Sequence, residues 1–160
     1  SGRGAMGFFG SWTTGEMANN DYTAANADVA PLPKGKQAAT VFNGLANSVA
    51  ASTENEEAAL KFVEFLGTEE AMRLQGENGA AIPAYEGTDE SFVNAYSQFN
   101  IQVYVDQMEN AYIKPYSKET ARWEDVENNA LMSVFDGKAS VADVAADIVA
   151  GVEEGLANEK

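Results

Sequence analysis

Apolar residues recur along most of the chain at the spacing of amphipathic helices, and segments with the pattern of strands are few. The most regular helical pattern lies near the C-terminus, where Ser140 followed by Asp143 predicts a helix start. The apolar stripe behind this start consists of Val141, Val144, Ala145, Ile148, Val149, Val152 and Leu156. We therefore expect a long amphipathic helix over this region.

Two helices are expected near the middle of the chain. Thr53 followed by Glu56 has the form of a capping box, and Gly67 predicts the end of the first helix. Thr68 is the expected N-cap of the second helix, which should end near 76–79. The apolar face of the first helix is Ala59, Phe62, Val63 and Leu66.

Three further helices are predicted at about 89–99, 101–111 and 118–135, the last ending at Gly137. A break at 114–116 separates the second of these from the third, because it contains a proline. The apolar face of the third helix is Trp123, Val126, Ala130 and Val134.

Extended segments are predicted at 4–9, 28–33 and 80–85. The first is short, apolar and rich in small residues, so we expect a buried strand that ends at the turn residues Gly10 and Ser11. In the second segment, two prolines bias the residues before them toward extended geometry.

A fourth extended stretch, 40–51, contains the pair Asn43-Gly44. This pair is compatible with a two-residue hairpin turn, or with a kink where the backbone approaches a ligand. Because so few strands would make a thin sheet, we expect this sequence to be part of a longer chain.

Composition and charge exclude several classes of partner. The chain has 25 acidic and 10 basic residues and a net charge of -15, so nucleic acids and anionic membrane surfaces are poor partners. No apolar run approaches the length of a membrane span. Part of the charge serves solubility.

Cysteine and histidine are both absent, which excludes disulfides, thiolate metal sites and a Ser-His-Asp triad. The residues 2–7 match the spacing G-x-G-x-x-G, but no strand precedes them and no helix pattern follows, so we interpret them as packing glycines of the first strand. Acidic pairs such as Glu69-Glu70 fall at helix starts and solvent-facing positions, where they complement helix dipoles and water. No metal site and no cofactor are expected.

The two tryptophans, Trp12 and Trp123, are the candidate binding residues. Each is predicted at the end of an element, where an indole can keep one face exposed for stacking on an apolar ligand surface. The alternative, that each packs in the core, stays open at this stage.

Five segments of the chain carry a family resemblance, namely 5–12, 28–35, 41–46, 56–71 and 79–84. In this order they are similar to the second half of sugar-binding proteins of ABC importers, within the bacterial extracellular solute-binding family. The maltodextrin-binding type is its best-known member.

The resemblance implies an α/β fold of the periplasmic-binding-protein-like type II, with two lobes that close around a ligand. This chain would be a C-terminal portion of such a protein, rich in helices. The segments 1–38 and about 115–160 would belong to the C-terminal lobe, and about 39–114 to the N-terminal lobe.

The resemblance also implies a set of ligand contacts. Trp12 corresponds to a tryptophan at the end of a strand that stacks on the sugar, with Gly10 and Ser11 beside it. Asn43 and Gly44 correspond to a strand that crosses between the lobes beside the ligand.

Arg122 and Trp123 correspond to the start of a helix that approaches the cleft. The implied function is to bind a sugar or oligosaccharide outside the cell and deliver it to the membrane permease subunits of an ABC importer, without catalysis. The protein would be extracellular, a cell-surface lipoprotein or periplasmic, with its signal in the missing N-terminal part. A non-sugar ligand, a carbohydrate-active enzyme and a helical interaction module are the alternatives.

Overall fold

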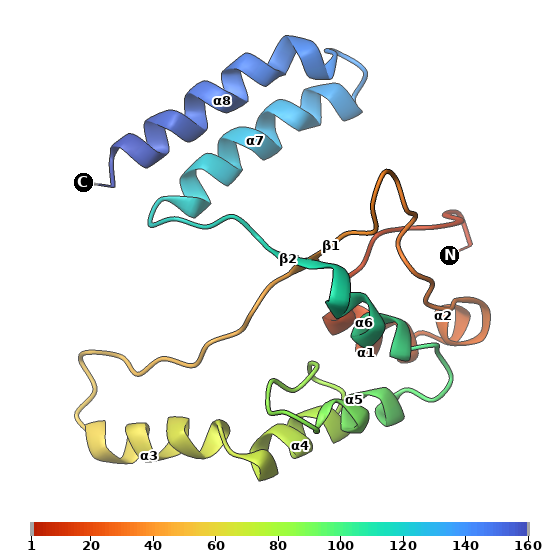
Figure 1. The fold of residues 1–160 in the computed structure, drawn as a ribbon, viewed down its shortest axis with the longest axis vertical. Coiled ribbons are helices and arrows are strands. Elements are labelled where there is room, and N and C mark those ends of the chain that lie inside the picture. The colour runs from red at the N-terminus through yellow and green to blue at the C-terminus, as the bar shows by residue number, and fades with distance from the viewer. Residues whose placement is uncertain (1, 160) are drawn as a thin grey trace. The chain divides into compact units, whose positions relative to one another are not determined.

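The computed structural model describes residues 2–159 (Figure 1). The chain forms two compact units, Ser1–Ile113 and Lys114–Lys160. The elements of the first unit are η1 (Ser11–Thr13), α1 (Thr14–Ala18), α2 (Asp21–Asn26), β1 (Thr40–Phe42), α3 (Glu56–Leu66), α4 (Glu69–Glu77), α5 (Asp89–Ala95), α6 (Gln102–Asp106), η2 (Gln107–Asn110) and β2 (Ala111–Ile113). The second unit consists of α7 (Thr120–Phe135) and α8 (Val141–Ala157). None of the helices described has the length and apolar character needed to cross a membrane.

The segment before η1 is not a strand. Residues 4–9 belong to no sheet, and the side chains of Met6, Phe8 and Phe9 are exposed. The prediction of a buried strand with packing glycines at 4–9 is therefore wrong. A strand needs a neighbour whose N–H and C=O groups pair with its own, and no segment among the described residues pairs with 4–9.

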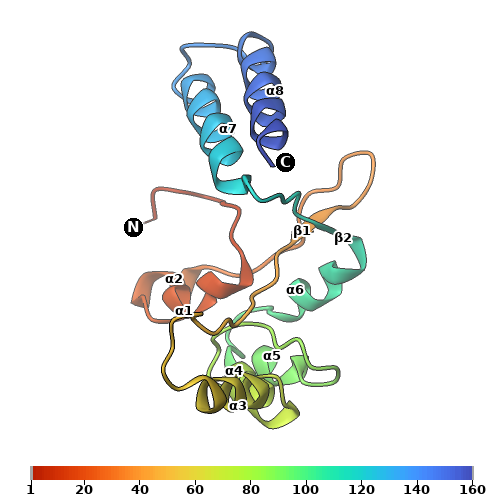
Figure 2. The same ribbon diagram turned by 90° about the vertical axis from the view of Figure 1, so that its left-hand side faces the viewer.

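The two strands β1 and β2 form a parallel pair, with Thr40 opposite Ala111 and Phe42 opposite Ile113. Figure 2 shows the two strands side by side, with α6 leading toward β2. Because the partner of β1 is a distant parallel strand, Asn43-Gly44 is not the turn of a hairpin. The expected thin sheet is confirmed in the described part of the chain, where it contains two strands.

Helices α3 and α4 agree with the predicted pattern, except at the first N-cap. Asn55, not Thr53, is the N-cap of α3, and it makes no side-chain cap hydrogen bond. Thr53 Oγ1 instead accepts a hydrogen bond from the Asn55 N–H at 3.2 Å, so the predicted capping box is wrong. Thr68 caps α4 as predicted, because its hydroxyl oxygen accepts from the Ala71 N–H at 3.3 Å.

Helix α5 ends four residues earlier than predicted, and the cause is tertiary packing. Tyr96 leaves the helical conformation, and its hydroxyl donates a hydrogen bond to the Gly79 carbonyl at 2.9 Å. Its ring meets that of Phe92 edge to face at 5.8 Å. Phe92 belongs to the buried cluster of this unit, together with Phe99 and Ile101.

The second unit is a pair of adjacent helices joined at Gly137, whose φ of 72° suits glycine (Figure 1). The prediction that Ser140 opens the last helix is confirmed: Ser140 and Asp143 form a complete capping box at the start of α8. The pair packs closely because glycines of α8 face α7. Gly151 lies against Val126, and Gly155 lies against Trp123.

Candidate ligand-binding site

The turn that carries Trp12 is closed by hydrogen bonds from the two threonines that follow it. The Thr13 N–H and hydroxyl donate to the Gly10 carbonyl at 3.0 and 2.8 Å. The hydroxyl of Thr14, a residue that is only 1% exposed, donates to the Ser11 carbonyl at 2.7 Å. These hydrogen bonds fix the backbone conformation of the residues before and after Trp12.

The indole of Trp12 is 64% exposed and folds back over Gly10. A β-carbon at position 10 would overlap three atoms of the six-membered ring of the indole. Glycine is therefore required at this position for the ring to lie where it does. The ring rests on backbone, and most of its surface remains open to solvent.

Tyr104 of α6 connects this turn to the core of the first unit. Its side chain packs against the cluster of Phe92, Phe99 and Ile101. Its hydroxyl lies 3.5 Å from the Phe9 carbonyl oxygen. Burial raises the pKa of Tyr104, and a hydrogen bond with the Thr14 side chain lowers it by less.

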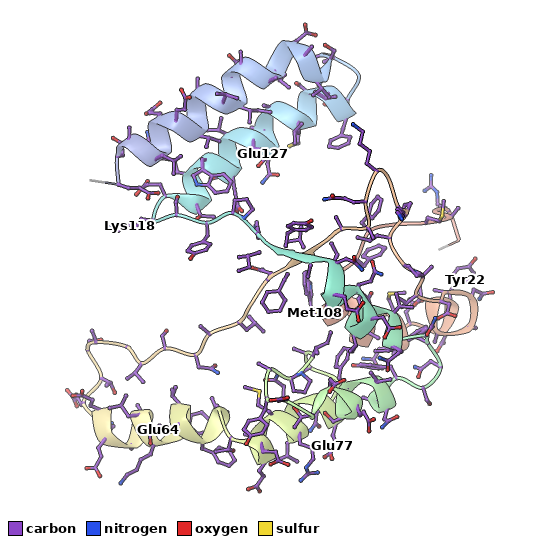
Figure 3. The ribbon with its side chains drawn as sticks, in the orientation of Figure 1. Tyr22, Glu64, Glu77, Met108, Lys118 and Glu127 are labelled. Carbon is purple, nitrogen blue, oxygen red and sulfur yellow. The ribbon has the colours of Figure 1, made fainter. Side chains whose placement is uncertain are left out.

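Several other aromatic side chains of the first unit are also exposed, and Figure 3 shows ring side chains around the two strands and η2, near Met108. The Phe8 ring is 80% exposed, and the Phe9 ring folds over Gly7 as the indole of Trp12 folds over Gly10. The exposed aromatic residues of the segment before η1, of η1 and of the two strands are Phe8, Phe9, Trp12, Phe42 and Tyr112.

Asn43 and Gly44 directly follow β1, and both are exposed. The space around Gly44 is open, because a β-carbon there would meet no atom within 4 Å. In the structure as described, no hydrogen bond joins this pair to Gly10, Ser11 or Trp12.

The predicted residues of the second unit are held by neighbours in that unit. Trp123 is 8% exposed, lies against Gly155 and donates its indole N–H to the Ser117 hydroxyl at 2.9 Å. Arg122 donates to Glu154 of α8 at 2.6 Å. Within this unit Trp123 packs in the contact between the two helices, and its ring has no open face.

The arrangement around Trp12 offers contacts suited to binding. An exposed ring provides an apolar surface, and nearby backbone and hydroxyl groups provide hydrogen bonds. Among residues 2–159, no group of three or more Asp and Glu side chains is placed to hold a metal ion.

Sequence reasoning missed the roles of Thr14 and Tyr104. The sequence did not single out Thr14, because threonine three residues after a turn residue such as Ser11 is common in many turns. Tyr104 is 95 residues from Phe9, so their contact depends on the fold. The exposed Phe8 and Phe9 were assigned to a strand because apolar residues between glycines are typical of buried strands.

The residues 1–73 match the family model of the bacterial extracellular solute-binding protein. The matched part is slightly less than half of the 160 residues, and it contains Trp12 and Asn43 but not Trp123. A comparison with curated proteins and another with solved structures found no match. The family match supports an extracellular binding protein of ABC transport with a periplasmic-binding-protein-like fold, and proteins of this family are not enzymes.

Proposed function

We propose that this chain is part of a solute-binding protein that captures a sugar or oligosaccharide and delivers it to the permease subunits of an ABC importer. The observation that carries this proposal is the exposed indole of Trp12, seated on Gly10 within the segment that matches the family. Sugars combine apolar C–H faces with hydroxyl groups, so an aromatic ring beside polar groups is a suitable receptor.

The other proposed contacts come from the same unit. Gly10 and Ser11 supply backbone N–H groups beside the ring, since their carbonyl oxygens already accept hydrogen bonds from Thr13 and Thr14. Asn43 supplies a side-chain amide that both donates and accepts hydrogen bonds. Gly44 leaves room for a ligand to approach the backbone, because nothing described lies within 4 Å of its β-position. We leave Arg122 and Trp123 out of the contact set, because each already has partners in the second unit.

The proposed mechanism is binding coupled to closure of two lobes. The segments 1–38 and about 115–160 would lie in the C-terminal lobe, and about 39–114 in the N-terminal lobe, of a type II fold. The ligand favours the closed form only to the extent that it binds that form more tightly than the open one. The protein would work outside the cell, as a lipoprotein or in a periplasm.

Tryptophan fluorescence tests the proposal directly. In a Trp123→Phe variant, Trp12 is the sole indole, and titration with maltotriose, cellotriose and xylotriose should change its emission saturably for one of them. Trp12→Ala, made in the wild-type chain, should weaken binding of that sugar about tenfold or more, measured by calorimetry. The free energy of unfolding should change by less than about 0.5 kcal/mol, because the ring is exposed.

Equal losses of binding and stability in Trp12→Ala would instead show that the ring is part of the core. Hydrolysis of any of these sugars would show an enzyme. No response of Trp12 to any of the sugars, with calorimetry also silent, would contradict sugar binding by this chain.

A helical interaction module is a second candidate, and one observation favours it. No residue of α3 is buried, and Phe62 on its predicted apolar face is 61% exposed. An apolar helix face of this kind is typical of surfaces that bind another protein. Concentration-dependent association in sedimentation experiments, reduced by Phe62→Glu, would support this function in place of sugar binding.

A further inference from the structure

We propose that Asn43 is a site of spontaneous deamidation, at which its side-chain amide is converted through a succinimide into isoaspartate and aspartate. The proposal rests on the backbone and surroundings of Asn43 and Gly44, and it does not depend on the proposed transport function. A second Asn-Gly pair in the same unit, Asn78-Gly79, has the same chemistry and a different structure, so it serves as an internal comparison.

The reaction needs a nucleophilic backbone nitrogen that can reach the side chain of the residue before it. The Gly44 nitrogen attacks Cγ of Asn43, a new C–N bond closes a five-membered imide, and the side-chain nitrogen leaves as ammonia. Water then adds to one of the two imide carbonyls and opens the ring. Opening at one carbonyl gives aspartate, and opening at the other gives isoaspartate, in which the main chain runs through the side-chain carbon.

The structure leaves the Asn43 pair free for this attack. Strand β1 ends at Phe42, so Gly44 lies beyond the paired backbone. Within the part of the chain that the structure describes, the Gly44 N–H donates no hydrogen bond, and the Asn43 side chain makes none. Both residues are exposed, and the position where Gly44 would carry a β-carbon is empty to 4 Å. Glycine after asparagine also removes the steric hindrance that a side chain would bring.

The Asn78 pair is held in place by the end of helix α4. The Gly79 N–H donates to the Gly76 carbonyl at 2.7 Å, and the Asn78 side-chain amide donates to the Leu74 carbonyl at 2.8 Å. Gly79 is buried with φ at 67°, beneath the ring of Tyr96. Both reacting groups are therefore committed to hydrogen bonds that must break before the imide can form.

Conversion at Asn43 would change the chain at the end of β1. Aspartate and isoaspartate each add a negative charge to a chain that already carries -15. Isoaspartate also lengthens the backbone by one carbon directly after the strand. The conversion products would therefore separate from the original chain by charge.

The test is incubation of the full chain at neutral and mildly alkaline pH, with samples digested and their Asn43 and Asn78 peptides quantified by mass spectrometry. We expect Asn43 to convert at least about tenfold faster than Asn78, because each hydrogen bond that protects Asn78 lowers the reactive population by a factor of about five. The rate at Asn43 should rise with pH, because the attacking nitrogen must lose its proton. Isoaspartate should be the product along with aspartate.

Two controls distinguish the effect of the folded structure on the conversion rate from the effect of the local sequence. In denaturant both pairs should convert at similar rates, because the protection of Asn78 is lost. Gly44→Ala should slow conversion at Asn43 in the folded chain without changing the rate at Asn78. If Asn43 and Asn78 are converted at equal rates in the folded chain, the proposal is wrong.

Discussion

Gly10 illustrates how a single position can decide the placement of a functional side chain. The ring of Trp12 occupies the space that a side chain at position 10 would need. The position of the ring, and therefore which of its faces is exposed, depends on the absence of that side chain. The backbone of Gly10 is extended, with φ at -80° and ψ at 159°, which any residue adopts. Glycine is needed here for space and not for conformation.

Gly10→Ala should therefore move the Trp12 ring without unfolding the chain. In a Trp123→Phe background, the emission of Trp12 should shift, and affinity for the sugar that binds should fall several-fold. The free energy of unfolding should change by less than about 1 kcal/mol, because alanine fits this backbone. Gly35→Ala is the matched control, since a β-carbon there meets nothing within 4 Å and Gly35 is not among the proposed ligand contacts. Identical Trp12 emission in the Gly10→Ala and parent chains would show that the ring does not rest on Gly10.

Helices α7 and α8 show how small residues determine the distance between two elements. Gly151 and Gly155 lie one turn apart on the face of α8 that meets α7, and Val126 and Trp123 fill the space above them. Glycine lowers helix propensity by about 1 kcal/mol relative to alanine, so its presence twice within one helix face calls for a packing reason. The reason differs between the two positions.

Gly151→Ala should destabilise the helix pair, by about 1–3 kcal/mol, because its β-carbon would overlap the Val126 side chain. Gly155→Ala should be neutral or should stabilise by up to about 1 kcal/mol. Its β-carbon would lie 3.4 Å from the nearest Trp123 atom, which is ordinary contact. Denaturant unfolding of the two variants measures the difference. Equal effects would mean that the helices do not pack in this register.

Two carboxylates, one in the first turn of α8 and one just after its last turn, make the stability of the second unit depend on pH. Hydrogen bonds from the Ser117 hydroxyl and then from the Glu119 N–H hold the pKa of Glu159 below its ordinary value. Hydrogen bonds from the Ser140 N–H and hydroxyl do the same for the pKa of Asp143. A lowered pKa in the folded state means that the folded state binds the proton less readily than the unfolded state.

The second unit should therefore lose stability as the pH falls through the ordinary carboxyl range and below it. Above the unfolded-state pKa the stabilisation is complete, and it disappears as the two carboxylates are protonated. Thermal melts followed by circular dichroism from about pH 6 to about pH 3 measure the loss. Glu159→Gln should flatten this dependence. Glu153→Gln should leave it unchanged, because that exposed side chain forms no hydrogen bond or ion pair within the described residues.

The chain as a whole exposes more surface than its mass requires. Its accessible surface is 11941 Å², whereas a folded monomer of 17.0 kDa exposes about 7,700 Å² and two separate folded units of these sizes about 9,000 Å². The large apolar side chains that are exposed include Phe8, Phe62 and Phe135. Contact with another protein surface would remove these side chains from water.

The local sequence determined the features that depend on neighbours within a few residues. The capping box at Ser140, the N-cap at Thr68 and the helix end at Gly137 were all predicted, because each depends on backbone groups three or four positions away. The apolar face of α7 was predicted for the same reason, and its residues Trp123 and Val126 pack against glycines of α8. The predicted face of α8 is only partly confirmed, because Val144 is buried but Val141, Val149 and Leu156 are exposed. Trp12 was identified as a candidate because it follows a glycine turn.

Only the tertiary structure decided features that depend on distant partners. Residues 4–9 have the composition of a strand, but a strand requires a paired neighbour, and none is described. The hydrogen bond from Tyr96 to Gly79, 17 residues earlier in the chain, accompanies the early end of α5. The difference between Trp12 and Trp123 was likewise invisible in the sequence. Exposure of an indole depends on what packs against it, and in Trp123 that partner is a glycine 32 residues away.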